Sequence, residues 1–499
     1  MRRVELRVAS LCLAAQKNKA QRTKGDSALA VKHHGTVPFK GMSHLCLFGE
    51  NQADRFGRLF QQLPPLYLNP TLLHEIGKSG GVMEDTGLPN LTKNVAAGLI
   101  FFGQFVDHDI TLDASSSLRN NNEPNEITNV RTPSLDLDCL YGDGPEAHPY
   151  LYDGDKMLTG SDYASDANDL RHHDLPRTPK GTAIIGDPRN DENRVISQLQ
   201  LAMLRFHNRV YDEVHSEWEE ARRVTTWHYQ WLVINEYLRT ICGDWVVDDI
   251  LANGRKIYRP ECGGSHNAYI PIEFATAAYR YGHTMIPQKM RVQPGGIQHV
   301  LFSPSSALGR GFTPVGSTDG VVDWESLFDS GNGNYERAGQ VDTKLAAALL
   351  DLPFMPPSAP AFERSLAVRN LLRAQSFLVP SGEQVAECMA ASGADEISAS
   401  DIAKVREAGA KLGLPKATPL WLYILAEGRV IGRMDGEKSF SKGEGLGPVG
   451  ARLVAEVIIG LLELDHRSFM GSNRNWSPLD SADRVGNNGV TSIYQMLTS

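Results

Sequence analysis

The segment that most constrains the fold of this chain is an apolar run that ends in three ionisable residues. Residues 95–106 read VAAGLIFFGQFV, and Asp107, His108 and Asp109 follow directly. A charged side chain is costly to bury unless it is paired or bound to a metal. The triplet must therefore reach the surface or find partners elsewhere in the chain.

If residues 94–110 form a helix, Gln104, Asp107 and His108 fall at positions i, i+3 and i+4. These spacings place side chains on one face of a helix. Asp109 then points in another direction. The pattern predicts a helix end that offers a histidine and a carboxylate to one side and a second carboxylate to another. A polar helix terminus that faces solvent is the alternative.

Helical spacing of apolar residues recurs along the chain, strand-like alternation is scarce, and no Pro- or Ser-rich linker divides the sequence after its first residues. We expect helices at 94–110, 192–218, 224–242, 270–286, 341–351, 361–375, 400–411 and 448–463. We therefore predict a mainly α fold, in which residues 58–499 form a single large helical domain with long loops and very little β structure. Residues 1–57 are expected to form a basic, largely irregular N-terminal extension.

The charge of the chain is unevenly distributed. Its net charge is −9, but residues 1–40 hold nine Lys or Arg against Glu5 and Asp26, which gives +7 there and −16 in the remainder. An acidic body argues against nucleic acid as a partner of the main domain. The six cysteines are scattered without a CxxC pair, so we expect free thiols and no disulfide framework. No apolar run approaches the roughly 18 residues of a membrane span.

The first residues, MRRVELRVASLCLAAQ, combine early arginines with a short apolar stretch. Glu5 precedes that stretch, which is at the short end of the range for signal peptides. We therefore expect a cytoplasmic or non-classically exported protein rather than a secreted one. The compartment and the oligomeric state stay open, as does the role of the basic N-terminal segment.

A second motif, RTPSLDLDCLYG, contains oxygen donors at alternate positions: Thr132, Ser134, Asp136 and Asp138. In an extended or looping backbone, alternate residues face the same way. Two carboxylates, a hydroxyl and backbone carbonyls suit a hard cation such as Ca²⁺. The motif lacks the Gly and terminal Glu of an EF-hand loop. A polar loop without a metal is the alternative.

Two further pairs are spaced three residues apart. Arg189 and Glu192 lie at a predicted helix start, where a carboxylate usually serves the helix dipole and an arginine usually forms a surface ion pair. Arg280 and His283 lie in TAAYRYGHTMIP, and Gly282 leaves space beside the histidine. A histidine in an apolar helix is commonly a core residue. However, a neutral imidazole beside a flat space is also what a haem iron requires.

Taken together and in this order, these motifs resemble the animal-type haem peroxidase family, the myeloperoxidase–cyclooxygenase superfamily. The resemblance runs from about residue 60 to residue 465. It rests on QxxDHD at 104–109, TxxxDxDxxYG at 132–142, GDxRxxE at 186–192, RYGH at 280–283 and RNLLR at 369–373. Each motif is weak alone, but their joint occurrence in order is a strong signal.

The resemblance implies a haem b cofactor held between two histidines. His108 would be the distal histidine, with Gln104 in the same cavity and Arg189 as the distal arginine. On the other side, His283 would bind the iron, and Asn370 would accept its other N–H.

The resemblance also implies covalent attachment and a calcium ion. Asp107 and Glu192 match the carboxylates that form ester bonds to haem methyl groups, and Arg280 would face a haem propionate. The implied calcium ligands are Asp109, Thr132, Ser134 through its carbonyl, Asp136 and Asp138.

The residue types suit reduction of hydrogen peroxide. One peroxide oxygen must lose a proton and the other must gain one, and a neutral His108 can act as base and then as acid. A fixed cation such as Arg189 stabilises negative charge on the leaving oxygen. We therefore expect a haem peroxidase that oxidises small donors, namely bromide, iodide, thiocyanate or phenols.

The sequence departs from two branches of the family. Chloride-oxidising members carry a methionine after the ester glutamate, where this chain has Asn193, so we expect no sulfonium link and weak chloride oxidation. Cyclooxygenase-like and fatty-acid dioxygenase members carry a radical-forming tyrosine three residues before the iron-binding histidine, where this chain has Arg280. One helix step turns a side chain by roughly 100°, so Tyr279 and Tyr281 should not replace that tyrosine.

Two alternatives therefore remain beside the peroxidase hypothesis. One is a fatty-acid dioxygenase or cyclooxygenase-like haem oxygenase. The other is a non-catalytic, peroxidase-like binding protein, against which the presence of both His108 and Arg189 argues.

Overall fold

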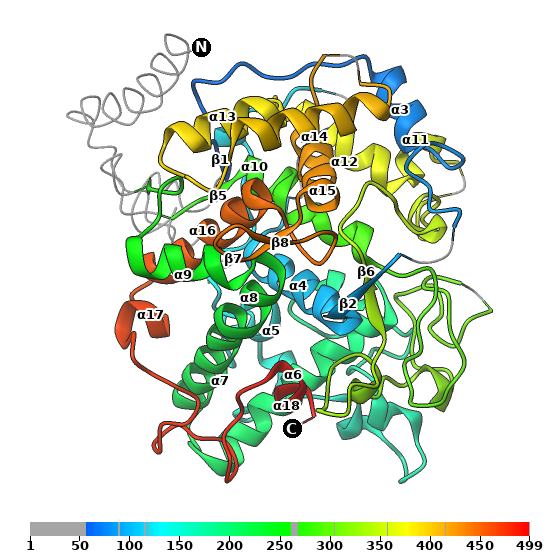
Figure 1. Ribbon diagram of the computed structural model, residues 1–499. Helices are drawn as coiled ribbons and strands as arrows, with labels where there is room; N and C mark the ends of the chain where they lie inside the picture. Colours follow the sequence, from blue (N-terminus) through cyan, green and yellow to red (C-terminus); the bar gives the residue numbers. More distant parts are fainter. Residues whose placement is uncertain are drawn as a thin grey trace.

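The computed structural model describes residues 56–498, apart from residues 88–89, 114–115, 119, 261–267, 304, 357 and 415. Helices dominate the described part of the chain, and they pack around one hydrophobic core (Figure 1). The mainly α prediction is therefore confirmed. The helices are α3 Pro70–Gly77, α4 Ala97–Ile110, α5 Asp138–Tyr141, α6 Arg194–Glu213, α7 Trp218–Leu232, α8 Arg239–Cys242, α9 Asp244–Asn253, α10 Ile272–Thr276, α11 Ala361–Arg364, α12 Leu366–Ser376, α13 Gly382–Ala391, α14 Ala399–Lys411, α15 Leu420–Val430, α16 Pro448–Leu464, α17 Phe469–Ser472 and α18 Ile493–Leu497.

The strands of the described residues are short and form four two-stranded sheets. The first sheet is parallel and the other three are antiparallel. The pairs are β1 Phe56–Gly57 with β5 Ile270–Pro271, β2 Leu91–Ala96 with β6 Arg337–Gly339, β3 Tyr152–Asp153 with β4 Lys156–Met157, and β7 Arg433–Gly436 with β8 Ser439–Ser441. No helix among these residues is both long enough and apolar enough to cross a bilayer.

Helix α4 is the central element for the site. Of its 14 residues, 12 are buried, as expected for a helix that is apolar on all sides. It packs against α6, β6 and the 3₁₀ helix Ala278–Met285 (Figure 1). Gly103 permits a close approach, because a Cβ there would lie 2.5 Å from the Tyr237 hydroxyl. The helix ends where the Thr111 N–H donates to the Asp107 carbonyl.

A second buried helix, α16, begins at Pro448, where the predicted helix at 448–463 starts. The Glu427 carboxylate of α15 accepts the N–H groups of Val449 and Gly450, and so caps the first turn. Burial raises the pKa of Glu427 to about 8. This capped helix packs against α8, α9 and α15.

The predicted helix at 341–351 is wrong, because only the 3₁₀ turn Ala347–Leu349 forms there. The backbone of this segment bonds to distant segments instead. The Val341 N–H donates to the Gly443 carbonyl, and the Leu345 N–H donates to the Met83 carbonyl. The predicted helix at 270–286 also divides, into β5, α10 and the 3₁₀ helix Ala278–Met285.

Of the predicted N-terminal extension, residues 1–55 lie outside the described residues, and Phe56–Gly57 form β1. The expectation of free thiols holds for Cys139 and Cys242, which are both buried. It is wrong for Cys388, which is disulfide-bonded.

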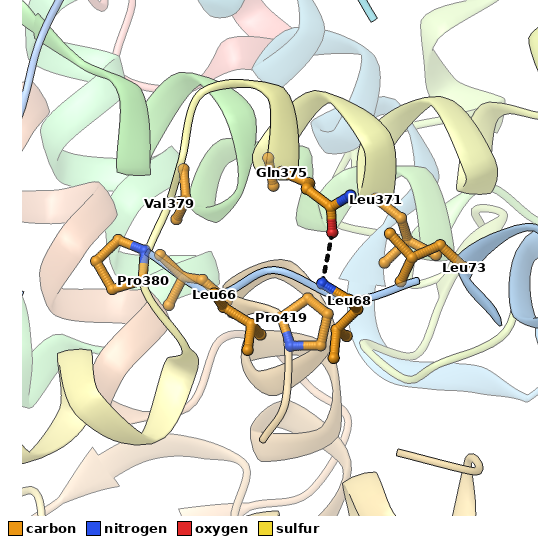
Figure 2. Close-up of a pocket in the computed structure, with 10 residues that line it drawn as sticks. Leu66, Leu68, Leu73, Leu371, Gln375, Val379, Pro380 and Pro419 are labelled. Atoms are coloured by element: carbon orange, nitrogen blue, oxygen red, sulfur yellow. Dashed lines mark hydrogen bonds between the residues drawn. The ribbon is translucent and has the colours of Figure 1, made fainter. Parts of the chain in front are cut away.

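Residues 64–69 run in an extended conformation along the surface of α12. The Leu68 N–H donates to Gln375 Oε1 over 2.8 Å (Figure 2). The Leu66 N–H donates to the Val379 carbonyl over 3.0 Å. A hollow of about 10 Å³ lies between these segments, and its lining includes Leu66, Leu68, Leu73, Leu371, Leu420 and Pro419. Since a hollow of this size holds at most one water, it is not a ligand site.

Candidate active site

One cavity of about 370 Å³ lies between α4, the 3₁₀ helix Ala278–Met285 and the segment that precedes α6. Cavities of this order bind small molecules and cofactors. Its polar lining is Gln104, Asp107, His108, Arg189, Glu192, Asn193, Arg280, His283 and Arg369. Its apolar and aromatic lining includes Ile100, Phe101, Tyr237, Tyr279, Tyr281, Ile286, Leu301, Phe302, Leu349, Leu352, Phe354 and Leu366.

His108 projects from α4 into this cavity as a neutral base. Its Nδ1 lies 2.7 Å from Asn190 Oδ1, and the Asn190 amide nitrogen donates to Gln200 Oε1 over 2.8 Å. Because Gln200 fixes the Asn190 amide with its oxygen toward the ring, Nδ1 carries the proton and Nε2 keeps its lone pair. Burial, together with the nearby Arg189 charge, lowers the pKa of His108 to about 3.

Arg189 is fixed at the end of α4. Its Nη2 donates to the backbone carbonyls of His108 over 3.0 Å and Thr111 over 2.6 Å. The same nitrogen lies 2.7 Å from a carboxylate oxygen of Asp187. Asp187 also binds Arg131, and the two arginines outweigh burial and lower the pKa of the Asp187 carboxyl. The cavity therefore holds a cation next to a neutral imidazole.

Two carboxyl groups face the same cavity. Burial raises the pKa of Asp107, and it raises the pKa of Glu192 to about 7. The Thr111 hydroxyl donates to Asp107 over 3.1 Å, and the Gln104 amide donates to Glu192. Both acids thus lie close to His108 and retain protons more readily than exposed carboxyls do.

His283 lines the cavity from the 3₁₀ helix Ala278–Met285. Burial, with the Arg280 charge as the second cause, lowers the pKa of His283 to about 3. Its Nδ1 lies 2.8 Å from the Asn370 amide nitrogen, while Asn370 Oδ1 accepts from Arg280 Nη1 over 3.1 Å. The resemblance implies the reverse orientation, with the Asn370 oxygen toward His283. Turning the amide by 180° would give that arrangement, and it would require Arg280 to bind another acceptor.

A separate cluster lies on the other side of α4. Asp109, Asp136 and Asp138, named here the acidic triad, are buried, and one oxygen from each lies within 4.8 Å of the others. The Thr132 hydroxyl donates to Asp136 over 3.2 Å, and Ser134 is half-buried in the same loop. Three carboxylates this close repel one another unless a cation balances them.

An ion-pair chain joins the acidic triad to the cavity. Arg131 Nη1 lies 3.5 Å from Asp138, and Arg131 Nη2 lies 2.5 Å from Asp187. Asp187 in turn binds Arg189. The residues of the triplet point in two directions, as predicted: Asp107 and His108 line the cavity, and Asp109 belongs to the acidic triad.

Sequence patterns did not indicate Asn190, Gln200 or Tyr237 as parts of the site. Asn190 lies inside the GDxRxxE motif, but nothing in that motif shows which ring nitrogen it meets. The hydroxyl oxygens of Tyr237 and Tyr281 lie 2.8 Å apart. This pair joins the π-helical segment Val233–Leu238, which contains Tyr237, to the 3₁₀ helix that carries Tyr281 and His283.

The lining residues fit a haem group. Two neutral imidazoles reach one cavity from separate elements, and apolar side chains cover much of its surface. Burial lowers the pKa of Arg280, so an anion beside this side chain would stabilise its charge. A flat, apolar, iron-containing group with carboxylate side chains meets each of these requirements.

Residues 114–312 match the family model for animal haem peroxidases. The match identifies an animal haem peroxidase domain in this segment of the chain. The matched range contains Arg189, Glu192, Arg280 and His283, whereas α4 with His108 precedes it.

Curated relatives of this haem peroxidase domain are distant. The chain is 26% identical to chorion peroxidase of Drosophila melanogaster over 211 residues, which are 38% of this chain and 26% of that protein. It is also 26% identical to peroxinectin A of Dictyostelium discoideum over 214 residues, which are 36% of this chain and 37% of that protein. The chain thus spans about a third or less of the length of these relatives.

Solved structures show the same fold over nearly the whole chain. Peroxidase A from Dictyostelium discoideum superposes with a TM-score of 0.60 at 16% identity, covering 89% of this chain and 92% of that one. A fatty acid alpha-dioxygenase from Oryza sativa superposes with a TM-score of 0.56 at 15% identity, covering 99% and 92%. At these identities the likeness establishes the fold of the haem peroxidase domain and no more.

Proposed function

We propose that this protein is a haem-dependent peroxidase that reduces hydrogen peroxide while it oxidises a small donor such as bromide, iodide, thiocyanate or a phenol. The observation that carries this proposal is the placement of two neutral imidazoles, His108 and His283, on one cavity. Bound haem b would supply the iron at which the O–O bond is cleaved and the capacity to accept electrons from the donor.

His108 would move the proton. Nε2 takes a proton from one peroxide oxygen and returns it to the other, while Nδ1–H stays on Asn190. Arg189, which the carbonyls at the end of α4 hold in place, stabilises the negative charge that develops on the leaving oxygen.

His283 would hold the iron through Nε2, which requires a proton on Nδ1 and the Asn370 oxygen turned toward it. Arg280 would then be released from Asn370 to pair with a haem propionate. Asp107 and Glu192 would form the ester links to haem, since both carboxyl groups line the cavity. Asn193, which caps α6 through a bond to the Ile196 N–H, has no thioether sulfur, so no sulfonium link is expected and chloride should be a poor donor.

We also propose that the acidic triad binds Ca²⁺, with Thr132 and the carbonyl of Ser134 completing the ligand set. Three buried carboxylates with their oxygens close together support this assignment. Oxygen ligands from carboxylates, hydroxyls and carbonyls are those that Ca²⁺ prefers.

A fatty-acid dioxygenase is the second candidate. Three tyrosines line the cavity, namely Tyr237, Tyr279 and Tyr281, which supports this alternative. Against it, the residue three positions before His283 is Arg280, and the Tyr281 hydroxyl is bonded to Tyr237. Oxygen uptake with linoleate compared with peroxide-dependent iodide oxidation distinguishes the two candidates.

The test begins with protein purified in the presence of haem. An absorption spectrum before and after peroxide should show a Soret band that shifts, together with iodide oxidation. His283→Ala should lose the Soret band, and His108→Leu should keep it but lose about 10²- to 10⁴-fold in the rate of its shift after peroxide. The exposed His173, replaced by Ala, is the matched control and should behave as wild type. A wild-type protein that binds haem but neither reacts with peroxide nor oxidises any donor would overturn the proposal.

A further inference from the structure

Three phenylalanines gather at the opening of the cavity. The Phe354 ring centroid lies 5.6 Å from that of Phe302 and 6.4 Å from that of Phe312, and both pairs meet edge to face. Phe302 and Phe354 line the cavity. Among the described residues of its lining, Phe354 alone is exposed, at 40%, and Phe312 beside it is 49% exposed. These three residues, named here the phenylalanine collar, therefore mark the route from solvent.

Two members of the phenylalanine collar have backbone conformations that L-residues rarely adopt. The φ angle is +61° at Phe302 and +51° at Phe312. Bulky residues in this left-handed region are strained, and such strain persists where the surrounding structure imposes it, often at functional sites.

The surrounding structure does impose the position of Phe312. Its N–H donates to the Asp191 carbonyl over 2.7 Å, and a Cβ on the preceding Gly311 would overlap the Glu192 carbonyl. The loop is therefore locked against the segment that carries Glu192, which lines the cavity. The position of Phe312 at the opening is therefore fixed relative to the side of the cavity that Glu192 lines.

We propose that the phenylalanine collar binds the aromatic ring of a phenolic donor, and that it makes the enzyme selective for phenols over halides. This inference rests on the proposed peroxidase function. Exposed aromatic rings are stabilised when they pack against one another with edge-to-face or offset geometry. A phenol ring can therefore add to the existing edge-to-face cluster. A hydrated halide ion gains nothing from apolar rings.

The balanced reaction is the oxidation of two phenols by one peroxide. Each phenol loses its hydroxyl hydrogen as one electron and one proton and becomes a phenoxyl radical. Hydrogen peroxide takes up the two electrons and two protons, its O–O bond breaks, and two waters form. Leu301 and Leu352, which also line the cavity, extend the apolar surface inward from the phenylalanine collar.

The experiment uses haem-loaded protein and 4-methylphenol as the probe. Calorimetry without peroxide gives its Kd, and steady-state kinetics give kcat/KM for 4-methylphenol and for iodide. Phe354→Leu and Phe312→Leu keep apolar bulk but remove a ring. Each should raise the Kd and lower kcat/KM for 4-methylphenol by about 3- to 10-fold, the size of an aromatic-pair contribution. The kcat/KM for iodide should fall by a smaller factor than that for 4-methylphenol, because iodide makes no ring contact with the collar.

The matched control is Phe440→Leu, since Phe440 is 38% exposed on β8 and does not line the cavity. It should leave both donors unaffected. Equal losses for iodide and 4-methylphenol in the two collar variants, or no change in the Kd of 4-methylphenol, would overturn the proposal. So would tighter binding of octanoate than of 4-methylphenol, which would indicate an alkyl-chain site.

Failure of the collar proposal and failure of the proposed function give different results. If the wild-type protein oxidises iodide but the collar variants keep their affinity for 4-methylphenol, only the collar proposal fails. If the wild-type protein oxidises neither donor, the peroxidase proposal fails, and the calorimetric comparison still decides whether the phenylalanine collar binds aromatic rings.

Discussion

Replacing Asn190 by aspartate tests the role assigned to His108 most directly. Asn190 Oδ1 lies 2.7 Å from His108 Nδ1, so Asn190→Asp places a carboxylate against the ring with almost no change in volume. Gln200 can turn its amide and donate to the new carboxylate. A carboxylate beside an imidazole favours the protonated form, so the pKa of His108 should rise.

The magnitude follows from Coulomb's law. Two unit charges about 4 Å apart interact by about 4 kcal/mol at an effective dielectric constant of about 20. At 1.36 kcal/mol for each pKa unit, this raises the pKa of His108 by about 3, from about 3 to about 6. At pH 5 the fraction of neutral His108 should then fall from nearly all of the protein to about one tenth.

The assay is the rate at which the Soret band shifts after peroxide addition, measured between pH 4 and pH 8. Wild type should keep its rate down to pH 4, and Asn190→Asp should lose it below about pH 6. Asn190→Ala removes the acceptor without adding a charge, so it should lose about 10-fold in rate. The pH below which its rate falls should not rise above that of wild type. If the Asn190→Asp and wild-type profiles superimpose, His108 is not the base and the assignment of its tautomer is wrong.

Three other predictions concern stability. Chelation of Ca²⁺ should lower the urea midpoint, because an ion at 100 times its Kd stabilises the folded state by about 2.7 kcal/mol, and Mg²⁺ should not restore the midpoint. Gly103→Ala should cost about 1–3 kcal/mol of unfolding free energy, since its Cβ would lie 2.5 Å from the Tyr237 hydroxyl, while Gly316→Ala, with open space around it, should be neutral. The pKa of buried His228 is lowered from 6.5 to about 4, so its contribution to stability is complete above pH 6.5 and is lost as the pH falls toward 4. This loss is about 3 kcal/mol, and His228→Phe, which cannot be protonated, should flatten the stability profile over that window by a similar amount.

The apolar run at 95–106 was sufficient to predict α4 and the direction of each residue in the triplet. Helical spacing alone places Gln104, Asp107 and His108 together, and all three line the cavity. Spacing also predicts that Asp109 points away from these three side chains, and Asp109 does lie in the acidic triad. These features are local, because they depend on residues within one helix.

Features that depend on distant partners could not be predicted. The segment 341–351 has helical spacing, but its N–H groups bond to Met83 and Gly443, which are far away in the sequence. Asn190 selects the tautomer of a histidine 82 residues earlier. The disulfide at Cys388 is equally invisible to a count of cysteine spacings.

His108 and Asp109 are neighbours in one helix, and Arg131 and Asp187 connect Asp138 of the acidic triad to Arg189. A shift in the acidic triad would therefore be transmitted to His108 and Arg189. If the acidic triad holds Ca²⁺ as proposed, the ion would control the positions of both side chains without touching a substrate.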